Sequence, residues 1–222
     1  MSDIEFDQQG DWGVITLTRE KALNALTWDM VKDMYAQFII WARDDAIKAV
    51  MVCGAGEKAF CAGGDVVWMH GVARENPADV IPFFRDEYRL NTLIKEYPKP
   101  YVAMIDGIFM GGGVGISVHG GYRIAGDRTM FAMPETGIGM LPDVGGGHFL
   151  ARLPGGLGLY YGLTGARAKA ADCVASGVAT HYVPSMMQES MIASLISANL
   201  GEAAETAIQS VLFDFDTSPS EV

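Results

Sequence analysis

The chain has few cysteines and histidines, and neither set forms a recognisable pattern. Its three cysteines, Cys53, Cys61 and Cys173, include no C-x-x-C pair. An odd number without regular spacing excludes a disulfide scaffold and favours a reducing compartment, so we expect a cytoplasmic protein. The four histidines form no His-x-x-x-His pair and no cluster with cysteine. The sequence therefore predicts no metal site.

Positive charge and long apolar runs are also scarce. Lys and Arg number 16 against 27 Asp and Glu, which gives a formal net charge of −11. This balance disfavours broad binding to nucleic acids or anionic membranes. No apolar run approaches the ~20 residues of a membrane helix. The acidic N-terminal stretch has no apolar core of the kind that a signal peptide needs. We therefore expect neither nucleic acid nor a membrane as a partner.

What the sequence does have is an alternation of apolar strand-like segments with helical ones. The 222 residues, 50% of them hydrophobic, suit one compact domain. Strands are expected at 13–18, 49–53, 101–105, 122–125 and 130–133, and helices at 27–42, 80–95, 111–119, 145–153, 157–163, 170–176 and 185–213. This order predicts an α/β fold with a mostly parallel sheet.

Two glycine-rich segments, residues 59–65 and 106–113, share one design. Each follows an apolar stretch and precedes an expected helix. Ligands of α/β sheets bind at the carboxyl ends of strands, where one N–H from each loop would form a two-donor hole for a developing oxyanion. The helix expected near Gly112 would add the positive end of its dipole. The alternative is that these glycines only permit tight turns and close packing. Neither loop has the spacing of a nucleotide phosphate cradle.

Three carboxylates are candidates for acid–base chemistry. Glu135 and Asp143 lie beside prolines in an apolar, glycine-rich stretch, so desolvation would raise their pKa toward a catalytically useful range. The apolar neighbours expected to desolvate them are Phe131, Met133, Ile138, Met140 and Leu141. Spacing alone favours a capping or surface role for both acids. Glu87 lies on the expected 80–95 helix, where most carboxylates are solvated.

Several motifs together resemble those of the enoyl-CoA hydratase/isomerase (crotonase) superfamily, over nearly all of residues 13–183. They are Leu-Asn-Ala-Leu at 23–26, Lys-Ala-Phe-Cys-Ala-Gly-Gly-Asp at 58–65, Pro-Lys-Pro-Tyr-Val-Ala at 98–103, Met-Gly-Gly-Gly at 110–113, Met-Pro-Glu at 133–135 and Leu-Thr-Gly at 163–165. Within that superfamily the chain is most similar to the 3-hydroxyisobutyryl-CoA hydrolase branch, through residues 83–88, 111–120 and 131–147.

The resemblance implies a spiral of repeated ββα units that binds an acyl-CoA thioester, with coenzyme A as part of the substrate and no separate cofactor. The backbone N–H groups of Gly64 and Gly112 would hold the thioester oxygen. Glu135 matches the family's catalytic glutamate, Asp143 a second acid of the hydrolase branch, and Glu87 a substrate-contacting acid. Further substrate contacts are implied at Lys21, Ala22, Leu23, Ala62 and Asp65. The implied reaction is hydrolysis of a short, branched 3-hydroxyacyl-CoA, as in valine catabolism, by a chain that can form a homo-oligomer.

The chain departs from the family pattern at two points. Typical hydratases carry a second catalytic glutamate where this sequence has Gly115, which disfavours hydration. The hydrolases also extend for roughly another hundred residues of helices. We therefore expect an acyl-CoA-binding core in residues 1–184 and a shortened or incomplete helical segment in residues 185–222. Two alternatives stay open: enoyl-CoA hydratase or isomerase activity, and a non-catalytic form that only binds acyl-CoA.

Overall fold

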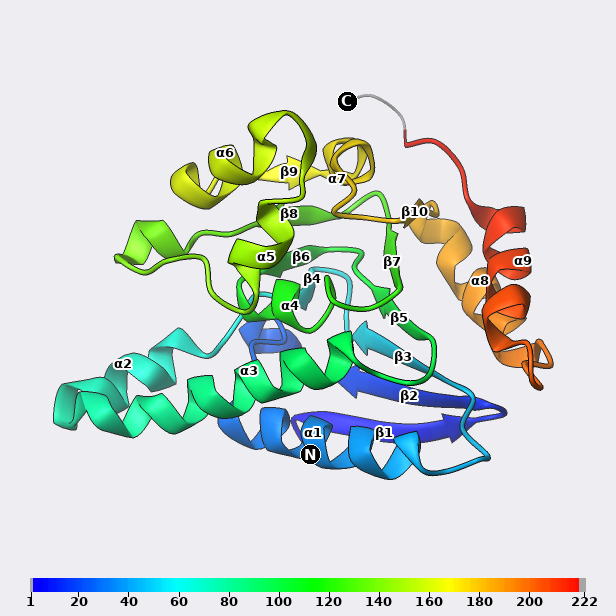
Figure 1. Cartoon of the computed structure of the whole chain (residues 1–222), viewed down its shortest axis with the longest axis horizontal. Coiled ribbons are helices and arrows are strands. Elements are labelled where there is room, and N and C mark those ends of the chain that lie inside the picture. Colours follow the sequence, from blue (N-terminus) through cyan, green and yellow to red (C-terminus); the bar gives the residue numbers. More distant parts are fainter. Residues whose placement is uncertain (1, 220–222) are drawn as a thin grey trace.

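The strands of the chain form two sheets in a computed structural model that describes residues 2–219 (Figure 1). The larger sheet has the order β1 (Ile4–Gln9), β2 (Trp12–Leu17), β3 (Ala49–Gly54), β5 (Tyr101–Met104), β7 (Tyr122–Ala125) and β10 (His181–Tyr182). The smaller sheet has the order β4 (Ala59–Cys61), β6 (Ile108–Met110), β8 (Met130–Ala132) and β9 (Ala168–Lys169). Every pair is parallel except β1–β2 and β8–β9. The predicted mostly parallel α/β fold is confirmed.

From β3 to β8, consecutive strands alternate between the two sheets, and helices follow each pair. β3 and β4 lead to α2 (Val66–Glu75), the short η2 (Pro77–Val80) and α3 (Ile81–Lys95), whereas β5 and β6 lead to α4 (Gly112–Gly115). β7 and β8 lead to η3 (Glu135–Ile138), α5 (Gly146–Leu150), η4 (Pro154–Gly156) and α6 (Leu157–Thr164). This repetition is the spiral of ββα units that the resemblance implies.

Helices cover both faces of the larger sheet. α1 (Trp28–Ala42) is capped by Thr27, whose side chain accepts a hydrogen bond from the backbone N–H of Met30. α1 and α3 pack in one core cluster with alternate β3 residues, Val50 and Val52. The intervening β3 residues face α8 (Ser185–Ser197) and α9 (Ala204–Phe215) in a second cluster, where the Trp12 indole donates to the Leu195 carbonyl over 2.8 Å. The sheet is therefore buried on both faces, as parallel sheets usually are.

Some elements differ from the predictions. The glycine-rich segment at 59–65 contains the three-residue strand β4, and β1, β6, β9, β10 and α2 were not expected. The expected helix at 111–119 ends after Gly115, where the Ser117 hydroxyl bonds to the carbonyls of Gly113 and Val114. The expected helix at 185–213 is two helices, broken near Gly201, which has a φ of +45°.

The remaining expected elements lie within a few residues of their predicted bounds, and α7 (Ala170–Ser176) matches its predicted range. Among residues 2–219, no helix has the length and apolar character needed to cross a membrane.

Candidate active site

The carboxyl ends of three parallel strands bring the predicted site together. β4, β6 and β8 are neighbours in the smaller sheet, with Cys61 paired to Phe109 and Phe109 to Phe131. The residues that follow these strands therefore leave the sheet at one edge. They are the glycine loop at 63–64, the glycine loop at 111–112, and Glu135 at the start of η3.

The two glycine loops are in direct backbone contact. A Cβ atom built on Gly112 would lie 3.1 Å from the backbone nitrogen of Gly64. Gly63 and Gly111 have φ angles of +111° and +48°, which other residues rarely adopt. Close packing is thus one reason why these positions are glycines. Packing does not explain why the N–H groups of Gly64 and Gly112 are left without a hydrogen-bond acceptor within residues 2–219.

Glu87 and Glu135 place their carboxyl groups beside the second glycine loop. A Cβ atom on Gly112 would overlap Oε1 of Glu87, and one on Gly111 would lie 3.0 Å from Oε1 of Glu135. Glu87 is 2% exposed and Glu135 is 6% exposed. The solvated alternative considered for Glu87 is therefore wrong, because α3 presents this residue to the interior.

Burial changes the protonation of both acids. Desolvation, with the charges of Asp143 and Glu135, raises the pKa of Glu87 to about 8. Desolvation and the charge of Asp143 raise the pKa of Glu135 to about 7. A hydrogen bond from the residue's own backbone lowers this pKa and so opposes part of the rise. Glu87 is then mostly a neutral carboxylic acid near pH 7, whereas Glu135 is balanced between its two forms.

Asp143 reaches the site from the segment that follows η3. Its carboxylate accepts a hydrogen bond from the Tyr88 hydroxyl of α3 over 2.8 Å. Burial raises the pKa of Asp143, and this hydrogen bond opposes the rise. The next residue, Val144, has a φ of +44°, and its carbonyl oxygen lies 2.7 Å from Nε2 of His119. A β-branched residue in this region is strained, and such strain often marks a functional loop.

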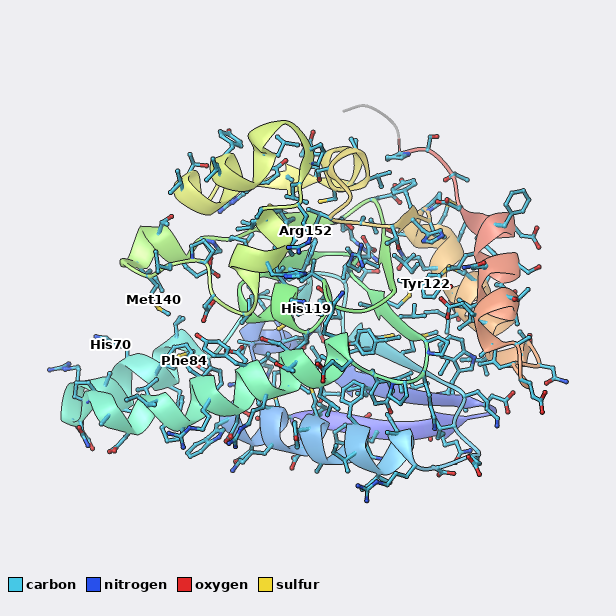
Figure 2. All side chains as sticks on the ribbon, viewed as in Figure 1. His70, Phe84, His119, Tyr122, Met140 and Arg152 are labelled. Carbon is cyan, nitrogen blue, oxygen red and sulfur yellow. The ribbon has the colours of Figure 1, made fainter. Side chains whose placement is uncertain are left out.

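The apolar shielding of Glu135 differs from the expectation. Phe131 and Met133 are fully buried, but Ile138, Met140 and Leu141 are 66%, 37% and 81% exposed. Figure 2 shows Met140 at the edge of the molecule. The carboxyl group of Glu135 is therefore shielded from water by the buried residues of and after β8 and by the glycine loops. The exposed residues that follow Glu135 contribute little to this shielding.

Gly115 has no room for a larger side chain. A Cβ atom there would lie 2.6 Å from Cβ of Val144 and 3.0 Å from Nδ2 of Asn91. Real Cβ atoms essentially never approach another atom within 3.0 Å. Val144 and Asn91 thus occupy the space that a glutamate at position 115 would need.

The further substrate contacts that the resemblance implies lie beside the first glycine loop. Lys21 and Ala22 belong to η1 (Glu20–Ala22), and the Leu23 carbonyl accepts a hydrogen bond from the Ala62 N–H over 3.0 Å. Asp65 accepts a bond from Arg19 over 2.9 Å and caps α2 through the Trp68 N–H over 3.0 Å. These bonds hold the loop, and the contact of Asp65 with a substrate stays a prediction.

Sequence reasoning missed several side chains that shape the site. Tyr88 and Asn91 were not singled out, although Asn91 is four residues after Glu87 and therefore on the same face of α3. His119 and Arg19 were missed because their partners are distant in the sequence and no local motif marks them.

Two other observations bear on what the molecule can bind. In the described part of the chain, no group of three or more His, Cys, Asp or Glu side chains is arranged to hold a metal ion.

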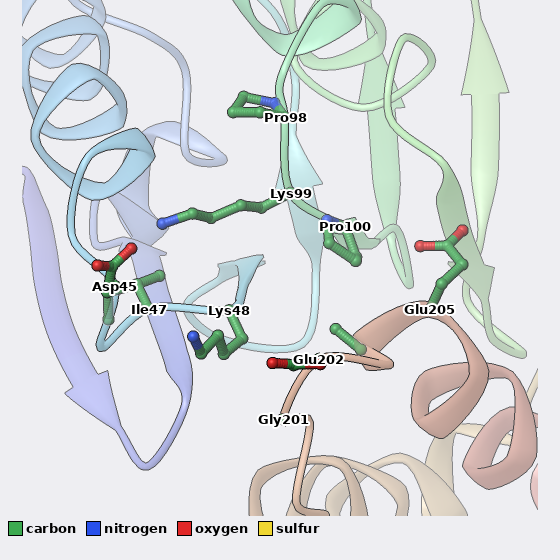
Figure 3. A pocket seen from close by; sticks show the side chains of 10 residues that line it. Asp45, Ile47, Lys48, Pro98, Lys99, Pro100, Gly201, Glu202 and Glu205 are labelled. Atoms are coloured by element: carbon green, nitrogen blue, oxygen red, sulfur yellow. The ribbon is translucent and has the colours of Figure 1, made fainter.

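A separate surface pocket of about 370 Å³ lies between residues 45–48, 98–100 and 201–205 (Figure 3). Its Lys99 ammonium donates to the carbonyls of Trp41 and Asp44 at the end of α1, so this lysine has a structural role.

The whole arrangement can be compared with known proteins. A family model described as enoyl-CoA hydratase/isomerase matches residues 12–222. The chain belongs to the enoyl-CoA hydratase/isomerase family. Members similar to it include the mitochondrial 3-hydroxyisobutyryl-CoA hydrolase of Danio rerio, 50% identical over 93% of this chain and 54% of that protein. The one from Homo sapiens is 45% identical over 97% of this chain and 55% of that protein. The chain spans about half the length of these curated relatives.

Solved members of the family confirm the expected crotonase fold. A carnitinyl-CoA dehydratase from Mycobacterium thermoresistibile has a TM-score of 0.92 and 42% identity, over 100% of this chain and 63% of that one. An enoyl-CoA hydratase from Rhodobacter sphaeroides has a TM-score of 0.85 and 37% identity, over 97% and 71% of the two chains. Family and fold are therefore established for the whole described chain.

Proposed function

We propose that this chain hydrolyses the thioester of a short, branched 3-hydroxyacyl-CoA, with 3-hydroxyisobutyryl-CoA as the first candidate. The observation that carries the proposal is the set of three carboxyl groups around the paired glycine loops, with position 115 closed by Val144 and Asn91. The curated relatives named 3-hydroxyisobutyryl-CoA hydrolase support the same reaction.

In the proposed reaction the thioester carbonyl oxygen accepts hydrogen bonds from the N–H groups of Gly64 and Gly112. These donors stabilise the negative charge that develops when the carbonyl is attacked, and loss of one such donor typically costs ~10²–10³ in rate. The C–S bond breaks, and water supplies both the hydroxyl group of the carboxylic acid and the proton that the departing coenzyme A thiolate takes up as it leaves as the thiol.

Glu135 supplies the attacking group in one of two ways. Its carboxylate attacks the carbonyl and forms a mixed anhydride that water then cleaves, or it removes a proton from an attacking water. Both routes need the ionised form of Glu135. Asp143 positions the water and the leaving thiol or binds the substrate hydroxyl, and Glu87 contacts the substrate as a neutral acid. Lys21, Ala22, Leu23 and Ala62 lie along the nucleotide part of coenzyme A, and Asp65 makes a further contact with the substrate.

The solved family members titled hydratase or dehydratase make double-bond hydration the second candidate. Hydration needs one group to deliver water and another to handle the proton of the adjacent carbon. The closed space at Gly115 argues against a second acid there. A form that only binds acyl-CoA is the third candidate, and a measurement of turnover separates it from the other two.

A comparison of two substrates tests the proposal. Thiol release from 3-hydroxyisobutyryl-CoA and loss of enone absorbance from crotonyl-CoA are followed with the same preparation. We expect release of free coenzyme A from the first substrate and no change of the second. Enone loss without thiol release would identify a hydratase, and binding without turnover of either would identify the binding-only form.

The expected oligomeric state and the expected cellular location both remain proposals. The family resemblance implies a homo-oligomer, and Leu141, Leu159 and Leu163 are more than two-thirds exposed beside the site. The molar mass in solution tests this assembly. The relatives above are named mitochondrial, so the expected cytoplasmic location has no support from them.

A further inference from the structure

Buried polar atoms without a hydrogen-bond partner are concentrated at the candidate site. Among the described residues, five buried side-chain nitrogen or oxygen atoms have no hydrogen-bond partner, and four of them belong to Glu87, Asn91 and Glu135. Buried polar groups in native proteins are nearly always paired, so a cluster of unpaired ones points to a ligand that pairs them. Of these three residues, only Asn91 has no role in the reaction described above.

Asn91 lies on the same wall of the site as Glu87. The two residues are four apart on α3, and Gly112 and Gly115 are three apart on α4, so each pair shares one helix face. Oε1 of Glu87 faces Gly112, and Nδ2 of Asn91 is 3.0 Å from the Cβ position of Gly115. Asn91 is therefore one helical turn along the wall from the glycine loops. It is 5% exposed, and neither its amide nitrogen nor its amide oxygen has a partner.

The chemistry of the amide indicates which ligand group it suits. A side-chain amide offers two N–H donors and one carbonyl acceptor. A hydroxyl group is both a donor and an acceptor, so one hydroxyl can pair with both ends of the amide. The amide is uncharged, so it adds no further charge beside the carboxyl groups of Glu87, Glu135 and Asp143. A purely apolar acyl chain would leave both amide atoms unpaired.

We propose that Asn91 is a specificity-determining residue whose side-chain amide binds the hydroxyl group of the acyl chain. The inference rests on the proposed function, since it needs an acyl-CoA in this site. It leaves Asp143 to position the water and the leaving thiol. An ordered water is the other source of a hydroxyl, and the test below separates the two.

The affinity of two unreactive thioethers of coenzyme A tests the proposal without turnover. They are S-(3-hydroxy-2-methylpropyl)-CoA and S-(2-methylpropyl)-CoA, which differ only in the hydroxyl. The unmodified chain should bind the hydroxylated thioether about tenfold more tightly. Asn91→Leu has the same number of side-chain heavy atoms and no hydrogen-bonding group. It should reduce the preference to less than about twofold and leave affinity for the other thioether nearly unchanged.

A matched control and a second variant make the outcome decisive. Thr92→Val removes an exposed hydroxyl from the same turn of α3 and should keep the full preference. Asn91→Ala removes the same polar atoms if the leucine variant does not fold, and should lose the preference too. An unchanged preference in the Asn91 variants, an equal loss for both thioethers, or no preference in the unmodified chain would overturn the proposal. Equal loss is the result expected if Asn91 holds a water or only packs. Thiol release, measured separately, reports on the proposed function alone.

Discussion

At the scale of single residues, the protonation of Glu135 decides when the site can act. This carboxyl group is buried beside Gly111, and the charge of Asp143 adds to the effect of desolvation on its pKa. A raised pKa means that Glu135 keeps its proton at pH values where an exposed glutamate is fully ionised. Both proposed routes use the ionised form, so activity should appear only as this proton leaves.

The first prediction is therefore a rise of kcat/KM with pH that is half complete near pH 7, followed by a fall as Glu87, whose pKa is raised to about 8, loses the proton of its neutral form. Asp143→Asn removes a negative charge that holds the Glu135 proton, so the midpoint should move down by about 0.5–1 pH units, although the maximal rate also falls. The measurement is the pH dependence of thiol release. A midpoint near the ordinary pKa of glutamate would contradict the buried, charge-coupled setting of Glu135.

At the scale of elements, α4 and the segment that carries Asp143 are fitted to one another. α4 consists of four residues, two of them Gly112 and Gly115, and Val144 fills the space beside Gly115. Val144 is 2% exposed and strained in its backbone, while His119 holds its carbonyl group. The position of Val144 thus requires glycine at position 115, because any side chain there would overlap it.

This fit predicts strong coupling between the two positions. Gly115→Ala should lower the free energy of unfolding by about 1–3 kcal/mol, because its new methyl group overlaps Val144. In combination with Val144→Gly, which removes the Cβ atom that the new methyl group would meet, the loss should be smaller than the sum of the two single losses by about 1–2 kcal/mol. Denaturant unfolding of the two single variants and the double variant measures this coupling. Additive losses would show that the two side chains do not compete for the same space.

The elements also show how far sequence reasoning reaches. Long periodic segments such as α1 and α3, and apolar strands such as β3, could be predicted because burial on one or both faces leaves a pattern in the residues. β4 has only three residues inside a glycine-rich stretch, and α2 has no buried residue, so neither has a readable pattern. α8 and α9 share one apolar face, and only the turn between them divides the predicted helix.

The candidate site was predictable only in part, for the same physical reason. Gly64, Gly112 and Glu135 each follow a strand, and the parallel order of β4, β6 and β8 brings them together. Tyr88 and Asn91 contribute from the side of α3, through contacts with residues more than 20 positions away. Such contacts depend on tertiary packing, which no local spacing encodes.

At the scale of the whole molecule, the larger sheet forms the buried core, and the candidate site lies at the edge of the smaller sheet. The larger sheet is covered by α1 and α3 on one face and by α8 and α9 on the other, so it is buried on both faces (Figure 1). The smaller sheet ends at the glycine loops, where Glu135 is held beside two N–H groups with no acceptor in the described chain. The central claim is that thioester hydrolysis at this edge depends on the Glu135 carboxylate.

The most direct test is the rate of thiol release from 3-hydroxyisobutyryl-CoA by the unmodified chain and by Glu135→Gln. The glutamine keeps the shape of the side chain but can neither attack the carbonyl nor accept a proton from water. Affinity for an unreactive coenzyme A thioether shows whether the site is still intact, and Glu189→Gln on the exposed side of α8 is the matched control. We predict a fall of at least ~10²-fold for Glu135→Gln with affinity nearly unchanged, and no fall for the control. A Glu135→Gln rate close to that of the unmodified chain would contradict the account.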